Sequence, residues 1–124
     1  MTRRVYSACL VARLVSNGGE RADVVVPDGH HWVIKSLTWC DNPTNDWALE
    51  NYIFGAYAVF RSQPLGEYGH PILLDYKLKD TVPGEWEGRI VLTGGDSLVL
   101  QNLTLPADEI HPISVAVFGY DLLD

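Results

Sequence analysis

The four histidines are the side chains of this chain best suited to chemistry, and their spacing argues against a metal centre. His30 and His31 are adjacent, whereas His70 and His111 lie far away in the sequence. Adjacent residues on a strand point to opposite faces of a sheet, so the two imidazoles of the pair cannot easily bind one ion. We therefore predict no metal and no cofactor, and we expect His30 and His31 to be half-exposed turn residues.

Carboxylates and nucleophiles give equally little support for catalysis. Glu85 and Glu87 flank Trp86, and Asp108 is followed by Glu109, but a glycosidase also needs a fixed separation between its two carboxyl groups. The chain has no Gly-x-Ser-x-Gly elbow and no Gly-x-Gly-x-x-Gly loop. We predict no catalytic residue and no enzyme. An enzyme that places two carboxylates in a cleft is the alternative that this pattern leaves open.

Charge and hydropathy exclude two further classes of partner. The 124 residues carry a net charge of −7, and the basic residues are scattered apart from Arg3 and Arg4. Nucleic-acid binding draws on clustered Lys and Arg that neutralise phosphates, so we predict no nucleic-acid partner. No apolar run approaches the ~20 residues that cross a bilayer, so we predict no membrane partner either.

The N-terminal segment and the two cysteines indicate production in a cytoplasm. The apolar stretch 5–15 is interrupted by Ser7 and Arg13 and lacks a convincing cleavage site, so it does not resemble a signal peptide. Without secretion, Cys9 and Cys40 are expected to be two reduced, buried thiols, the alternative being one disulfide between them. A chain of this length supports one domain, residues 1–124, with a flexible arm at residues 1–4.

Two strand-turn-strand patterns, one early and one late, must position the rest of the chain. The early pattern turns through Pro27-Asp28-Gly29, and the late one through Gly94-Gly95-Asp96. These residue types turn a chain tightly. We therefore predict structural turns at Pro27, Gly29, Gly94 and Gly95.

The whole chain has the composition of strands. Gly or Pro recurs every few residues, and β-branched and aromatic residues fill the intervals, so helical spacing is not sustained. Eight strands with regular turns indicate an all-β fold, a single-domain antiparallel β-sandwich that is jelly-roll-like. The predicted strands are 4–14, 23–26, 31–39, 52–61, 72–79, 87–92, 97–103 and 113–120.

Two of these strands are apolar on both faces. In a two-sheet sandwich one face of each strand is expected to be polar, so strands covered on both sides suggest that a second subunit packs there. The alternative is that the stretch 40–51 folds over the outer face. The candidate residues for a self or partner interface are Tyr6, Leu10, Tyr52, Phe54, Tyr57 and Phe60.

Two irregular stretches, 40–51 and 63–71, carry the remaining candidate contacts. Trp47 lies among polar residues that include Asn42 and Asn45, and Tyr68 lies in the second stretch. Such a Trp could stack on a sugar ring, anchor a protein contact or fold back as a lid over a sheet. These four residues are the candidate partner or glycan loop.

The order of the short motifs resembles a group of small all-β virion structural proteins of tailed bacteriophages, particularly those of actinobacteria. The residues that carry the resemblance are Val26-Pro27-Asp28-Gly29 before Trp32-Val33-Ile34, the strand Trp86-Glu87-Gly88-Arg89 before Gly95-Asp96, and a closing Gly119-Tyr120-Asp121-Leu122. These motifs span about three-quarters of the chain. Residues 42–69 depart from the pattern, and partner specificity is expected there.

The resemblance implies a non-enzymatic virion protein, made in the host cytoplasm. It implies most directly a capsid decoration or minor capsid protein that forms a dimer or trimer and bridges subunits of the major capsid protein, with Arg3 and Arg4 in a binding arm. The capsid surface is favoured over the tail, and a head-tail connector or minor tail component is the alternative. An alternative of another class is a carbohydrate-binding jelly-roll module that uses Trp47 and its Asn and Asp neighbours on a surface glycan.

Overall fold

A computed structural model describes residues 3–17, 21–41, 53–61, 70–77, 84–103 and 110–123, and its regular elements are all strands. The prediction of an all-β chain with eight strands is confirmed. Within the described ranges no helix is long and apolar enough to span a membrane. The strands are β1 (Arg3–Asn17), β2 (Arg21–Val25), β3 (His30–Asp41), β4 (Ile53–Val59), β5 (His70–Lys77), β6 (Gly84–Thr93), β7 (Ser97–Asn102) and β8 (Ile110–Leu123).

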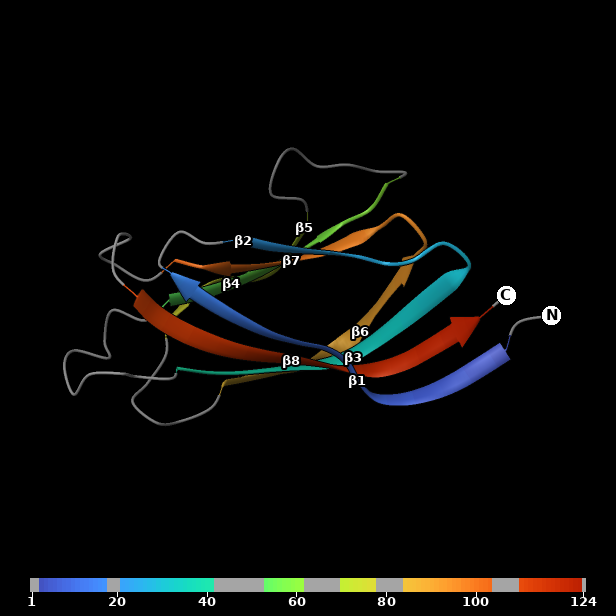
Figure 1. Cartoon of the computed structure of the whole chain (residues 1–124), viewed down its shortest axis with the longest axis horizontal. Coiled ribbons are helices and arrows are strands. Elements are labelled where there is room, and N and C mark those ends of the chain that lie inside the picture. Colours follow the sequence, from blue (N-terminus) through green and yellow to red (C-terminus); the bar gives the residue numbers. More distant parts are fainter. Residues whose placement is uncertain are drawn as a thin grey trace.

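The described strands form two four-stranded antiparallel sheets packed face to face (Figure 1). One sheet has the order β1-β8-β3-β6, and the other has the order β2-β7-β4-β5. The pairs β1–β8, β2–β7, β3–β6 and β4–β5 are nested, as if one long hairpin had been folded over itself. This nesting is the arrangement of a jelly roll, an architecture found in viral capsid and lectin domains.

The two predicted turns carry the chain from one sheet to the other. β2 and β3 flank the Pro27-Asp28-Gly29 turn, but β2 pairs with β7 and β3 pairs with β6 and β8. The turn at Gly94 and Gly95 likewise links β6 in one sheet to β7 in the other. The four strands that flank these two turns thus pair with strands that are distant in the sequence.

Side chains at alternate positions along the strands point into the space between the two sheets, and these side chains form the core. Trp39 from one sheet and Phe54 from the other meet there, with ring centroids 5.2 Å apart. The amide Nδ2 of buried Asn102 donates a hydrogen bond of 2.9 Å to the Val15 carbonyl, so the most buried polar side chain is satisfied. Other core residues include Ile34, Leu37, Leu92, Leu98, Leu100, Ile113 and Val117.

The two ends of the sandwich carry different parts of the chain. The β2–β3 and β6–β7 turns lie at the end where β1 begins and β8 ends (Figure 1). β4 ends and β5 begins at this same end, where Arg61 and His70 flank residues 62–69. Asp41 and Ile53, which flank residues 42–52, belong to the opposite end.

The cysteines differ from the prediction in their burial. Neither Cys9 nor Cys40 forms a disulfide within the described residues, and Cys40 is half-buried. Cys9, however, is exposed, and its Sγ lies 3.2 Å from the Val11 carbonyl. It lies where the register of β1 on β8 shifts between Ser7 and Val11, and this irregularity turns the thiol out of the sheet.

Candidate interaction surfaces

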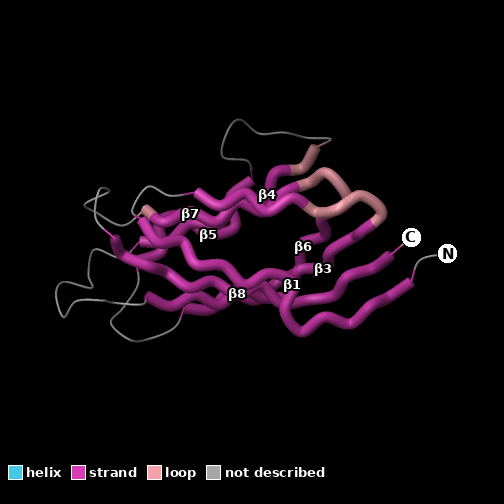
Figure 2. The backbone as a smooth tube through the Cα atoms, viewed as in Figure 1, coloured by secondary structure: helices cyan, strands magenta, loops and turns pink. Residues whose placement is uncertain are grey.

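The two sheet-crossing turns pack directly on each other. The amide of Val26 donates to the Asp96 carbonyl at 2.9 Å, and the amide of Gly95 donates to the Val26 carbonyl at 3.0 Å. Gly29 and Gly95 have φ of 81° and 92°, in the left-handed region that glycine tolerates. Figure 2 shows the two turns side by side at one end of the molecule.

Asp96 ties a third connection to these turns. Its carboxylate is only 7% exposed and accepts hydrogen bonds from the amide of Arg61 at 2.8 Å and the amide of Thr93 at 2.9 Å. The Thr93 hydroxyl donates a third, at 3.3 Å. These contacts join the end of β4 to the β6–β7 turn, so we assign Asp96 a structural role in holding this end of the sandwich together.

The histidines are distributed over separate surroundings. Nδ1 of His30 lies 2.9 and 3.0 Å from the two carboxylate oxygens of Asp121 on β8. His31 is the next residue along β3, and both are half-buried. His70 instead meets the ring of Phe60 edge-on, with centroids 5.2 Å apart. Among the described side chains, which exclude that of His111, no group of three or more His, Cys, Asp or Glu residues is placed to hold a metal ion.

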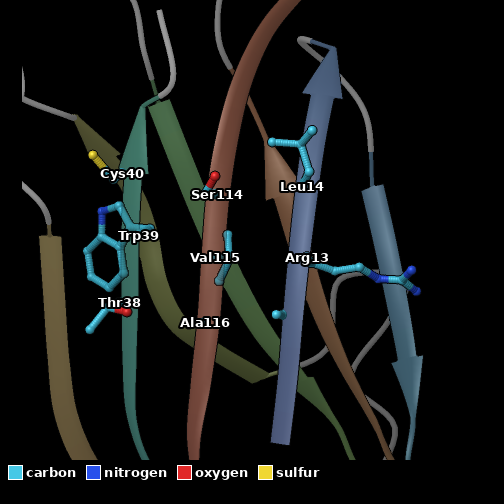
Figure 3. A pocket seen from close by; sticks show the side chains of 9 residues that line it. Arg13, Leu14, Thr38, Trp39, Cys40, Ser114, Val115 and Ala116 are labelled. Atoms are coloured by element: carbon cyan, nitrogen blue, oxygen red, sulfur yellow. The ribbon is translucent and has the colours of Figure 1, made fainter. Parts of the chain in front are cut away.

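A hollow of about 590 Å³ lies over β1, β8 and β3 (Figure 3). Two cross-strand rows of small or uncharged side chains form most of it. The register aligns Ala12, Ala116 and Thr38 in one row, and Leu14, Ser114 and Cys40 in the other. These positions alternate with core residues such as Val115 and Trp39, so the rows lie on the outer face of the sheet.

This outer face presents uncharged surface in an acidic protein. None of the six row residues is Asp, Glu, Lys, Arg or His, and Leu14 is 53% exposed at the rim of the hollow. Arg13 also borders the hollow, and its side chain extends away from β8 (Figure 3). We call the six row residues the outer-face hollow.

Two of the predicted interface residues are buried inside the single chain, which corrects the prediction. Phe54 is fully buried against Trp39, because its face of β4 looks into the core. Tyr57 is on the opposite face of β4 and is only 8% exposed, and its cross-strand neighbour Val99 on β7 is fully buried. The outer face of the second sheet is therefore already covered at this point, and neither side chain is available to a partner.

The other predicted interface residues fall into two groups. Leu10 and Phe60 are partly buried and pack against the core. For Leu10 the cause is the irregularity of β1 between Ser7 and Val11, which turns the side chain inward despite its spacing from Ala12. Tyr6 pairs with Tyr120 through the backbone, but its side chain lies outside the described residues, as does the whole of Tyr52.

The predicted loop contacts lie outside the described residues. This holds for Asn42, Asn45, Trp47 and Tyr68, and for the side chains of Arg3 and Arg4. The backbone of Arg3 and Arg4 pairs with Leu123 and Leu122 on β8, so these two residues belong to β1 and the prediction of a flexible arm is wrong for them. The flanking strands attach residues 42–52 and residues 62–69 to opposite ends of the sandwich.

The edge strand β6 carries the chain's clearest electrostatic feature. Glu85 and Glu87 are exposed on the same face of the strand, two residues apart. A hydrogen bond with Glu87 and the charge of Glu87 raise the pKa of Glu85. A raised pKa in the folded state means that this pair favours folding less as the pH rises past the ordinary Glu range.

The outer-face hollow was not predicted as a site. The signal that could have found it is the run of small residues at alternate positions of β1 and β8, Ala12 and Ala116 with Leu14 and Ser114. These residues form one surface only in the register that aligns them, and the sequence of neither strand specifies that register.

Comparison with known proteins gives a likeness of fold. No protein-family model matches the chain, and no curated protein matches it in sequence. Among solved structures, the fold is similar to chains in the structures of the Gx and Gt strains of infectious bursal disease virus, at TM-scores of 0.52 and 0.50 and at 9% and 10% sequence identity. The likeness covers 98% of this chain but about a third of each viral chain, 31% and 32%. It therefore shows a jelly-roll-like fold shared with virus proteins.

Proposed function

We propose that this protein is a non-enzymatic structural component of a virus particle. The observation that carries the proposal is the nested strand pairing of a jelly roll, together with a likeness of fold over 98% of this chain to a chain of a virus structure. Viral capsid domains are among the principal users of this architecture. The resemblance of the turn and strand motifs to virion proteins of tailed bacteriophages supports the same assignment.

Within that role, we propose that the protein decorates the capsid surface as an oligomer and bridges neighbouring shell subunits. The outer-face hollow supplies uncharged surface for a protein contact, with Leu14 exposed at its rim. The net charge of −7 keeps a protein made in many copies soluble. A protein that binds only the assembled shell stabilises that shell by mass action. A head-tail connector or minor tail component of the same particle would use the same kind of contact.

The test is the composition and architecture of particles of the virus that encodes the chain. We expect mass spectrometry of density-purified particles to detect the chain in tens to hundreds of copies, since a decoration protein follows the symmetry of the shell. Antibody labelling then separates the capsid surface from the tail. Absence of the chain from purified particles, despite its presence in the infected lysate, would refute the virion assignment.

Lectin domains also use the jelly roll, so a glycan-binding assay must accompany this experiment. Purified protein is applied to immobilised glycans beside a Trp47→Ala variant. Glycan binding that is lost in the variant, together with absence from particles, would favour the carbohydrate-binding alternative.

A further inference from the structure

The free edge of β6 has a side-chain pattern that complements itself. Among the described strands, β6 has β3 as its single neighbour, so its other edge presents backbone N–H and C=O groups that no described strand pairs with. The exposed row of the strand reads Glu85, Glu87, Arg89 and Val91, and the register of β6 on β3 shifts between Glu87 and Ile90, where Gly88 is exposed as well. The opposite row, which faces the core side, includes Trp86 and Ile90, both partly buried against the core.

Antiparallel pairing of two copies about Gly88 aligns these rows in complementary order. Residues whose numbers sum to 176 then lie opposite each other, which places Glu87 of each copy beside Arg89 of the other. On the core side the same register places Trp86 beside Ile90. Cross-strand pairs of opposite charge and of an aromatic with a β-branched side chain both stabilise a sheet. Gly88 contributes no side chain at the two-fold axis.

Neighbouring registers are less favourable. Centring the pair on Glu87 brings two Glu87 carboxylates together, and centring it on Arg89 brings two guanidinium groups together. If the pair is instead centred between two residues, each exposed residue of one copy lies opposite a core-side residue of the other. The second copy is then turned over and its apolar row faces water, because side chains alternate between the faces of a strand. Charges on an edge strand commonly prevent edge-to-edge association, but here the two signs occur in an order that selects one register.

From this complementarity we propose that two copies of the chain associate through β6, antiparallel about Gly88, into one continuous eight-stranded sheet. A two-fold interface of this kind uses the same patch on both copies. The inference rests on the proposed function, for which it names one self-contact. It also gives Arg89 a role near the Glu85 and Glu87 pair, whose mutual repulsion it would relieve.

The test is charge reversal with mixing, read by sedimentation of the full chain. Glu87→Arg alone and Arg89→Glu alone each replace two attractive contacts by two repulsive ones, and each should weaken the dimer about tenfold or more. An equimolar mixture of these two variants should form a heterodimer, because each supplies the charge that the other lacks. The double variant Glu87→Arg with Arg89→Glu should dimerise like the natural chain. Asp28→Arg, in the exposed β2–β3 turn, makes the same change of net charge as Glu87→Arg but away from β6, and it should leave the dimer intact.

Thermal melts of each variant confirm that the fold is retained. A monomer at all concentrations, or a dimer that both single variants leave intact, would overturn the inference. So would single variants whose mixture stays monomeric. If the protein is found in particles but its association does not depend on these charges, the β6 contact is refuted and the proposed function stands. If the protein forms a charge-dependent dimer but is absent from particles, the β6 contact stands and the proposed function is refuted.

Discussion

The outer faces of the two sheets have similar sequence patterns but different exposure. On the β2-β7-β4-β5 sheet, Val99 and Tyr57 face outward and are buried within the single chain. On the β1-β8-β3-β6 sheet, Leu14 faces outward and is half exposed beside the outer-face hollow. A strand that is apolar on both faces therefore has two possible causes, cover by its own chain and surface left open for a partner. This molecule contains the first, and we propose the second for the outer-face hollow.

The largest expected effect tests the covered face. Val99→Asp places a carboxylate in a fully buried position whose cross-strand neighbour on β2 is Asp23. A buried charge without a compensating partner costs about 3–5 kcal/mol. Chemical denaturation of the purified variant measures this loss. A loss below about 1 kcal/mol would show that the face around Val99 is open to water, and the contrast between the sheets would disappear.

Asp96→Ala tests the junction that fixes both sheets at one end. The change leaves the amides of Arg61 and Thr93 without their acceptor, and each unsatisfied buried donor costs about 1–3 kcal/mol. We expect a lower free energy of unfolding by about 2–4 kcal/mol, together with faster amide exchange at Arg61 and Thr93. Unchanged exchange at these two amides would argue that other groups hold the turns.

The smallest effect on stability is expected on the open face. Leu14→Asp changes an exposed side chain, so unfolding free energy should change by less than about 0.5 kcal/mol. Association with the shell should nevertheless weaken, because the charge enters the outer-face hollow. Leu14→Met serves as the control that keeps apolar contact. Normal shell binding by Leu14→Asp would dismiss the hollow as a contact surface.

The sequence predicted the strands well and their partners poorly. Alternating apolar residues and turn chemistry located all eight strands, because both signals are local. The Pro27-Asp28-Gly29 turn fits a hairpin and a sheet crossing equally well, so the nested pairing with β7 and β6 was not accessible from it. Alternation shows that Phe54 and Tyr57 lie on opposite faces of one strand, but it does not show that both faces are covered.

The candidate site could be predicted only in part for the same reason. Leu10 has the spacing of an outward residue, yet the register shift in β1 directs it to the core. Leu14 and Ala12 become part of a hollow only through their alignment with Ser114 and Ala116 on β8. Contacts between strands that are about a hundred residues apart decide both outcomes, and no local pattern encodes them.

A cryo-electron microscopy reconstruction of the virus particles in which we propose that the chain resides would test the proposed virion role most directly. We expect a jelly-roll density for this chain on the shell, with the β1-β8-β3-β6 sheet turned toward a protein neighbour and the β2-β7-β4-β5 sheet away from it. A complete reconstruction of shell and tail that contains no density for the chain would contradict the claim.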